Sequence, residues 1–194
     1  MKRVLLIALC CVLTSNCTRP TEAPRNAPVA STSVTPPSLE RMPGAVLYRA
    51  QVAFEQDDLT GLALALSQLD AVGLHPVGDE ARDVLARWRA AAADRTHVTR
   101  GRVLGPGFMV GELGPREERV LQQTFLSGRR AAISLSSLET RSLEVTVRNR
   151  RDESLCREIA AHVTCRWIPL YTHRHTITLR NPNAKKTRYQ LVID

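Results

Sequence analysis

Five short runs of alternating apolar and polar residues near the end of the chain constrain its fold more than any other feature. Residues two apart in an extended strand share a face, so each run has one apolar face and one polar face. The apolar members are Ala131, Ile133 and Leu135; Leu143, Val145 and Val147; Val163, Cys165 and Trp167; Ile177 and Leu179; and Tyr189, Leu191 and Ile193. We expect the polar members of the second run, Glu144, Thr146 and Arg148, to face outward. With turn residues at 149–152 and 181–184, the runs predict an antiparallel β-sandwich.

Residues 44–95 show instead the apolar period of helices. Its members are Leu47, Ala50 and Phe54; Leu59, Leu62, Ala63, Leu66 and Leu69; and Ala81, Val84, Leu85, Trp88 and Ala92. We expect Asp57 or Asp58 to cap the second helix, Gly73 to end it, and Asp79 to cap the third. Short helices in series favour a small antiparallel bundle. The expected fold class is α+β, with an N-terminal segment of about three helices before a C-terminal, jelly-roll-like antiparallel β-sandwich.

The segment 98–115 interrupts its apolar residues with glycine and proline. Its glycines are Gly101, Gly105, Gly107, Gly111 and Gly114. Their spacing fits neither the dinucleotide-binding fingerprint nor the P-loop. Pro106 also lacks the amide proton that a phosphate-binding loop would use. The segment therefore predicts a strand, a tight turn and a bulge.

The first 16 residues have the pattern of a secretory signal peptide. The basic pair Lys2 and Arg3 precedes an apolar run over residues 4–13. This run is too short to cross a bilayer as a helix, which needs about 20 residues. A buried N-terminal helix is the alternative, but the polar, proline-rich sequence that follows favours export. We assign residues 1–16 to the signal peptide.

The leader ends in a segment that resembles a bacterial lipobox, where small residues precede a cysteine that is lipidated and becomes the new N-terminus. Cys17 is the candidate lipidation site, although Asn16 is unusual before such a cysteine and Leu13 lies one position early. Residues 17–43 are rich in Pro, Thr, Ser and Ala. Such a composition buries too little apolar surface to fold, so we expect a disordered tether. An ordinary disordered tail would have the same composition.

Two cysteines remain once the leader and Cys17 are set aside, Cys156 and Cys165. An even pair in an exported protein predicts a disulfide, here across a hairpin-like segment. A zinc site and free thiols are the alternatives. The histidines that a zinc site could use are His162, His173 and His175. Their spacing from the cysteines matches no standard zinc pattern.

Several short motifs follow one another in the C-terminal part. They are Phe125-Leu126-x-Gly128, the strand 143–147, Cys165-x-Trp167-x-Pro169, the run 176–181 and Tyr189-x-Leu191. In their order, residues 103–194 resemble the bacterial pre-peptidase C-terminal domains. This resemblance implies a small jelly-roll-like β-sandwich on an exported protein, often attached to a peptidase, with a role in secretion, localisation or binding of polymers at the cell surface. We assign residues 98–194 to this domain.

Two departures from that family pattern bear on chemistry. Family members often carry Asp-x-Asp-Leu-Asp before the central strand, where the carboxylates can hold calcium, but this chain has Thr-Arg-Ser-Leu-Glu at 140–144. Calcium prefers about six or more oxygen ligands, so we expect no calcium here. His175 also stands where the family has an aromatic core residue.

Catalytic motifs are absent from the sequence. It contains neither G-x-S-x-G nor H-E-x-x-H. The neighbouring Glu117 and Glu118 lie between Arg116 and Arg119, which predicts a solvated charged turn. We therefore expect no enzyme, no catalytic residue, no cofactor and no metal.

The net charge of +8 permits attraction to anionic partners. Candidate contacts with an anionic lipid or glycan surface are Arg129, Arg130, Arg148, Arg150, Arg151, Lys185, Lys186 and Arg188. Solubilising turns are the alternative explanation for these residues. Export and the low aromatic content of 4% argue against nucleic acid, which is bound by stacking.

Together these features predict an exported, lipid-anchored protein of a bacterial envelope, periplasmic or associated with the outer membrane. The expected function is a non-enzymatic binding or scaffolding module. Its expected partners are the membrane, through the N-terminal lipid, and an envelope protein or glycan. The alternative is an accessory or targeting subunit of an exported peptidase or other hydrolase.

Overall fold

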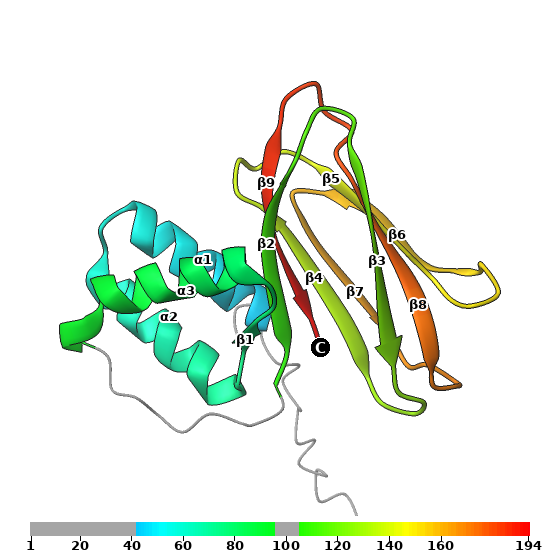
Figure 1. Cartoon of the computed structure of the whole chain (residues 1–194), viewed down its shortest axis with the longest axis horizontal. Coiled ribbons are helices and arrows are strands. Elements are labelled where there is room, and N and C mark those ends of the chain that lie inside the picture. The colour runs from blue at the N-terminus through cyan, green and yellow to red at the C-terminus, as the bar shows by residue number, and fades with distance from the viewer. Residues whose placement is uncertain (1–41, 96–104) are drawn as a thin grey trace, which may run out of the picture. The chain divides into compact units, whose positions relative to one another are not determined.

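The computed structural model describes residues 42–95 and 105–194, as three helices followed by a two-sheet β-sandwich (Figure 1). The predicted α+β class is therefore confirmed. The signal peptide, Cys17 and nearly all of the predicted tether lie outside the described residues.

The helices occupy the segment predicted for them. They are α1 (Pro43–Glu55), α2 (Leu59–Val72) and α3 (Asp79–Ala91), with a short 3-10 helix, η2 (Ala93–Arg95), at the end. Asp58 caps α2 by accepting a hydrogen bond from the Gly61 amide, at 2.9 Å. Gly73 ends α2 in the left-handed conformation, with φ +72°, which glycine adopts at low cost. The prediction for Asp79 is wrong, because Gly78 is the N-cap and Asp79 is the first residue of α3.

The sandwich consists of one five-stranded and one four-stranded sheet. Its strands are β1 (His75–Pro76), β2 (Gly107–Leu113), β3 (Glu118–Phe125), β4 (Ala131–Ser137), β5 (Leu143–Arg148), β6 (Ser154–Ala160), β7 (His162–Trp167), β8 (His173–Arg180) and β9 (Thr187–Ile193). The larger sheet has the order β1-β2-β9-β4-β7, and the smaller has the order β3-β8-β5-β6. All pairs are antiparallel except the short parallel pair β1–β2, which makes the larger sheet mixed.

The five predicted runs correspond to β4, β5, β7, β8 and β9. Their inward residues form the sandwich core, in which Ile133, Val145 and Leu179 are fully buried. The prediction that Glu144 and Thr146 face outward is wrong in that neither side chain is exposed to solvent. Their exposed fractions are only 7% and 8%. β5 lies between two other strands, and arginines from those neighbours pair with the Glu144 carboxylate and cover it.

The edge strands β3 and β6 of the smaller sheet were not predicted. Most of their residues are exposed, so neither strand has a continuous apolar face to produce a periodic signal. The expectation of a charged turn at Glu117 and Glu118 is wrong for Glu118, which is the first residue of β3.

The helices pack against the larger sheet and share a second apolar core with it. Phe108 of β2 and Val192 of β9 join Leu47, Leu66 and Trp88 from the helices in this core. Two backbone hydrogen bonds also connect the α2–α3 segment to β2 and the residue before it, from the His75 amide to the Pro106 carbonyl and from the Val77 amide to the Phe108 carbonyl. The described part of the chain contains no helix of the length and apolar character needed to cross a membrane.

Three turns meet at one end of the sandwich, which lies at the lower right of Figure 1. They connect β3 to β4 (126–130), β5 to β6 (149–153) and β7 to β8 (168–172). The pairing of Phe125 with His173, and of Ala131 with Trp167, places the first and third of these turns side by side. We call these three turns the loop end.

Candidate functional site

Hydrogen bonds hold two turns of the loop end together. The Gly128 amide donates to the Pro169 carbonyl at 2.8 Å, and the Ser127 amide donates to the Thr172 hydroxyl at 2.9 Å. The Ser127 hydroxyl donates to the Leu170 carbonyl at 2.6 Å. Gly128 has φ +70°, a conformation that other residues adopt only with strain. The two turns therefore form one connected surface.

A cluster of aromatic rings lies at the ends of β3, β7 and β8, directly beneath these two turns. Phe125, at the end of β3, makes edge-to-face contacts with Trp167 at 4.8 Å and with His175 at 5.3 Å between ring centroids. His173 stacks on His175 with centroids 4.2 Å apart. His175 is buried with an exposed fraction of 1%, which agrees with its expected place at an aromatic core position. The cluster joins the end of β7 to the beginning of β8.

Two polar atoms of this cluster are buried without a partner in the described part of the chain, Trp167 Nε1 and His173 Nε2. His173 Nδ1 lies 2.8 Å from the Tyr171 carbonyl, which can only accept, so Nδ1 carries the hydrogen of this bond. Because both atoms are inaccessible, a ligand would meet the surface of the turns before it could reach them.

Burial lowers the pKa of His175 below its ordinary value of 6.5. The hydrogen bond to the His173 carbonyl acts in the opposite direction, and the charge on His173 lowers the pKa further. A depressed pKa means that the unfolded chain takes up a proton before the folded protein does as the pH falls. The contribution of His175 to stability is therefore complete above about pH 6.5 and is lost progressively below it.

We expect the free energy of unfolding to fall as the pH is lowered from about 7.5 to about 5.5, with a smaller fall in the His175→Phe variant. The measurement is urea unfolding of both proteins across this range, with the two slopes against pH compared. Equal slopes would show that His175 does not carry this dependence.

A pocket of about 500 Å³ opens at the loop end, between the β5–β6 turn and the β7–β8 turn. Apolar side chains project around it and beside it, and their exposed fractions are 62% for Ile168, 78% for Leu170, 69% for Tyr171 and 50% for Leu126. These are four of the nine large apolar side chains that are exposed in residues 42–95 and 105–194. Such a concentration is typical of an interaction surface, whereas scattered exposed residues are not.

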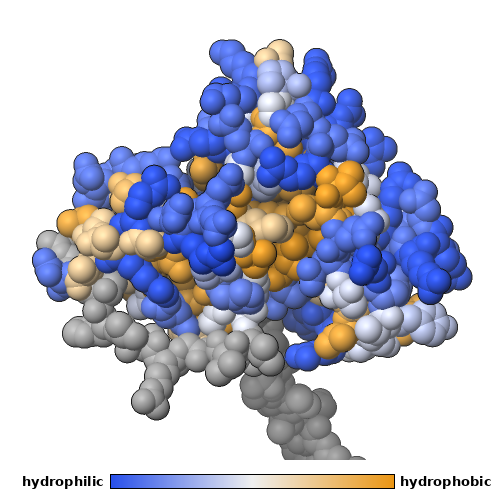
Figure 2. All heavy atoms as spheres, in the orientation of Figure 1, coloured by the Kyte–Doolittle hydropathy of each residue, from blue (hydrophilic) through white to orange (hydrophobic). Residues whose placement is uncertain are grey.

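A groove of about 530 Å³ lies next to this surface, along the open edge between the two sheets. Met109 of β2, Leu121 and Phe125 of β3 and Ile193 of β9 line it. Figure 2 shows apolar surface in this region between β2 and β3. The β3–β4 turn also contributes to the groove, which therefore continues into the loop end.

The structure divides the eight predicted anionic-surface residues between the two ends of the sandwich. Arg129, Arg130, Arg148, Arg150 and Arg151 lie at the loop end. Arg148 pairs with Asp152 at 2.9 Å, and Arg151 lies 3.6 Å from Glu153. Within the described residues, the side chains of Arg129, Arg130 and Arg150 form no ion pair.

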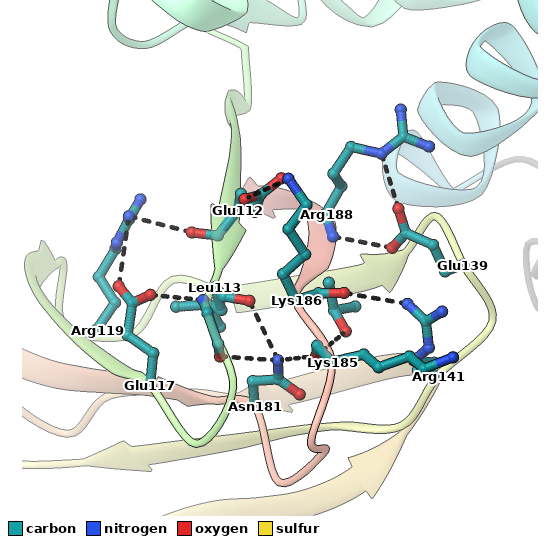
Figure 3. Close-up of polar contacts among 12 residues, drawn as sticks. Glu112, Leu113, Glu117, Arg119, Glu139, Arg141, Asn181, Lys185, Lys186 and Arg188 are labelled. Atoms are coloured by element: carbon teal, nitrogen blue, oxygen red, sulfur yellow. Dashed lines mark hydrogen bonds and ion pairs between the residues drawn. The ribbon is translucent and has the colours of Figure 1, made fainter.

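The other three predicted residues, Lys185, Lys186 and Arg188, lie at the opposite end, where carboxylates balance two of them (Figure 3). Lys186 Nζ lies 3.2 Å from the Glu112 carboxylate. Arg188 donates its Nε–H to Glu139 at 2.7 Å and lies 3.7 Å from Glu55. Of the eight predicted residues, Lys185 at this end and Arg129, Arg130 and Arg150 at the loop end are those that form no ion pair within the described residues.

No protein-family model matches the sequence, and no curated protein matches it. Some solved structures are similar to part of the chain. The pre-peptidase C-terminal domain of a Bacillus anthracis collagenase has 11% identity and a TM-score of 0.41, covering 45% of this chain and 87% of that domain. The Yersinia pseudotuberculosis-derived mitogen has 14% identity and a TM-score of 0.39, covering 46% and 84%.

A periplasmic inhibitor of g-type lysozyme from Aeromonas hydrophila is also similar, with 9% identity and a TM-score of 0.36, covering 62% of this chain and 94% of the inhibitor. At these identities and TM-scores, none of the likenesses indicates a shared ligand or activity.

The cysteines form the predicted disulfide. Cys156 of β6 and Cys165 of β7 are bonded, with their Cα atoms 5.9 Å apart, so they are not available as zinc ligands. His162 lies away from the other two histidines and makes a ring contact with Tyr48 at 4.7 Å. In the ranges that the structure describes, no cluster of three or more histidine, cysteine or acidic residues could hold a metal ion.

The apolar part of the candidate site was not predicted. The signal for it was present, because residues 167–171 form an uninterrupted apolar run, of which only Trp167 belongs to a predicted strand. The remaining four residues leave the sandwich and form the turn between β7 and β8. The exposed apolar side chains of this turn, Ile168, Leu170 and Tyr171, contribute little to the core, so the fold does not explain their presence.

Proposed function

We propose that this chain is a non-enzymatic binding module of a bacterial cell envelope, exported and lipid-anchored at Cys17, and that it contacts its ligand through the loop end. One observation carries this proposal: exposed apolar side chains and arginines without ion pairs occupy the same end of the sandwich, on the turns of the loop end. Both kinds of side chain are on the surface, where a ligand could contact them.

The chemistry of these turns supports binding. Aromatic residues and arginine contribute strongly to binding surfaces, because they combine a large contact area with hydrogen bonding. Leu170 and Tyr171 provide the apolar contact, and Arg150 provides a charge beside them. The disulfide supports the exported location, because such bonds persist in oxidising compartments.

The alternative is an accessory or targeting subunit of an exported hydrolase. It is supported by the sequence resemblance to domains that are often attached to peptidases. The same surface would then bind the hydrolase, so both functions predict a ligand at the loop end and differ in its identity.

A photo-reactive amino acid at Leu170 tests the proposed function in intact cells. Leu64 on α2 is the matched control, because it is also an exposed leucine, at 61% against 78% for Leu170. We expect irradiation to give cross-linked product from position 170 and little or none from position 64. Equal yields from the two positions would overturn the assignment of the loop end, and a hydrolase as the product would favour the alternative.

A further inference from the structure

The ligand class follows from three properties of the loop end: its apolar turns, its unbalanced charge and its position relative to the beginning of the described chain. We infer that the loop end docks onto the surface of an anionic membrane, with its apolar side chains entering the headgroup region. This inference rests on the proposed function and names the ligand of the same site.

The most exposed apolar residues are aliphatic or amphipathic. Ile168 and Leu170 have no hydrogen-bonding groups in their side chains, so a polar sugar or peptide backbone placed on them would gain little. Tyr171 beside them combines an apolar ring with a polar hydroxyl, which suits the boundary between headgroups and acyl chains. The turns are held to each other, so they can enter such a boundary without first becoming ordered.

The charge at the loop end complements an anionic surface. Arg129, Arg130 and Arg150 lie beside the apolar residues and form no ion pair within the described ranges. The nearby carboxylates of Asp152 and Glu153 are paired with Arg148 at the end of β5 and with Arg151 of the β5–β6 turn. Asp194, a further carboxylate at this end, forms no ion pair with any described residue. Arginines near an anionic leaflet each add to membrane binding.

The chain that precedes the described residues joins the fold close to the loop end. The Met42 sulfur accepts a hydrogen bond from Arg166, which precedes Trp167 at the end of β7. Only 24 residues lie between Cys17 and Met42. A lipid on Cys17 would therefore bring this end of the sandwich to the membrane.

The partners that compete with a membrane are a soluble glycan and a protein. A neutral glycan would be expected to use uncharged hydrogen-bonding groups, but two such groups of the site, Trp167 Nε1 and His173 Nε2, are buried beneath the turns. A protein could use the same apolar and basic groups. The proximity of the predicted lipid attachment favours the membrane over a protein, and the experiment separates them.

The test is co-sedimentation with vesicles of phosphatidylcholine alone and of phosphatidylcholine with phosphatidylglycerol. The protein would lack residues 1–17, so that neither the leader nor a lipid binds the vesicles; this leaves the described residues 42–95 and 105–194 intact. We expect binding to the anionic vesicles only, and weaker binding at high salt because salt screens the arginines. Equal binding to both vesicles would contradict the charge-dependent contact.

Two variants and two controls locate the contact. Leu170→Ser is expected to weaken binding about tenfold, and the triple change of Arg129, Arg130 and Arg150 to glutamine about 100-fold. Leu64→Ser and Lys185→Gln should bind like the parent protein, since both positions lie away from the loop end. Thermal unfolding would first show that every variant is folded. If the control variants then lose as much vesicle binding as the loop-end variants, the inference is overturned.

Absence of vesicle binding would also overturn the inference. The cross-linking at position 170 would then show whether the proposed binding function holds without a membrane as the ligand. A cross-linked protein or glycan from that position would keep the binding module and replace its ligand. No product from position 170 and no vesicle binding would reject both.

Discussion

The Asn181→Ala variant is expected to lose about 3 kcal/mol of unfolding free energy. Asn181 is fully buried in the β8–β9 turn, at the end of the sandwich opposite the loop end. Its side-chain amide donates to the carbonyls of Leu113, Gly114 and Lys185, at 3.1, 2.9 and 2.8 Å (Figure 3). Alanine would leave these carbonyls without that donor, and the Leu113 carbonyl is buried away from water.

The carbonyl oxygen of Asn181 is also used. It accepts hydrogen bonds from the backbone amide and the side-chain amide of Asn183, at 3.0 and 2.8 Å. A single side chain thus fixes its own turn and connects it to the end of β2 and the turn that follows. Such a network loses several bonds together when its central residue is removed.

Urea unfolding of Asn181→Ala and Asn149→Ala measures this effect with a matched control. Asn149 occupies the β5–β6 turn, where its oxygen accepts from the amides of Arg151 and Glu153 in a solvent-exposed setting. Because water can replace those bonds, we expect a loss of about 1 kcal/mol or less for the control. Losses of equal size would show that burial of Asn181 does not set its importance.

Removal of the disulfide is expected to have the second large effect. The variant with both Cys156 and Cys165 changed to alanine should lose about 2–3 kcal/mol of unfolding free energy, as the chain-entropy estimate gives for a loop of this size. The bond joins β6 to β7, which are edge strands of different sheets, so it closes one side of the sandwich. Only the short β6–β7 connection and core packing would then hold that side.

A reductant provides the control for this prediction. We expect dithiothreitol to lower the urea midpoint of the parent protein towards that of the double variant, and to leave the double variant unchanged. A parent protein with the same midpoint in oxidising and reducing conditions would contradict a stabilising disulfide.

The strands that could be predicted from the sequence are those with an apolar face in the sandwich core. β4 and β9 alternate because one face of each lies in the sandwich core. β3 and β6 are edge strands, where exposure of most residues removes the signal. A prediction based on alternation therefore finds strands with a continuous apolar face, including the edge strand β7, and misses the mostly exposed edge strands β3 and β6.

The candidate site was only partly predictable because it is assembled by the fold. The arginines could be listed from the sequence, but the list does not show that Lys186 and Arg188 would be paired with carboxylates at the other end. That separation depends on which turns meet, and hence on strand order. The apolar residues of the β7–β8 turn could have been singled out as exposed only once that turn was recognised.

The most direct test of the account is a scan of the photo-reactive residue over the described surface in intact cells. Positions Leu126, Arg150 and Leu170 sample the loop end, Pro115 and Thr140 sample the opposite end, and Leu64 samples the helices. We predict that cross-linking is strongest at the three loop-end positions, and that the products at these positions include lipid. Maximal cross-linking at Pro115, Thr140 or Leu64 would contradict a module that binds through its loop end.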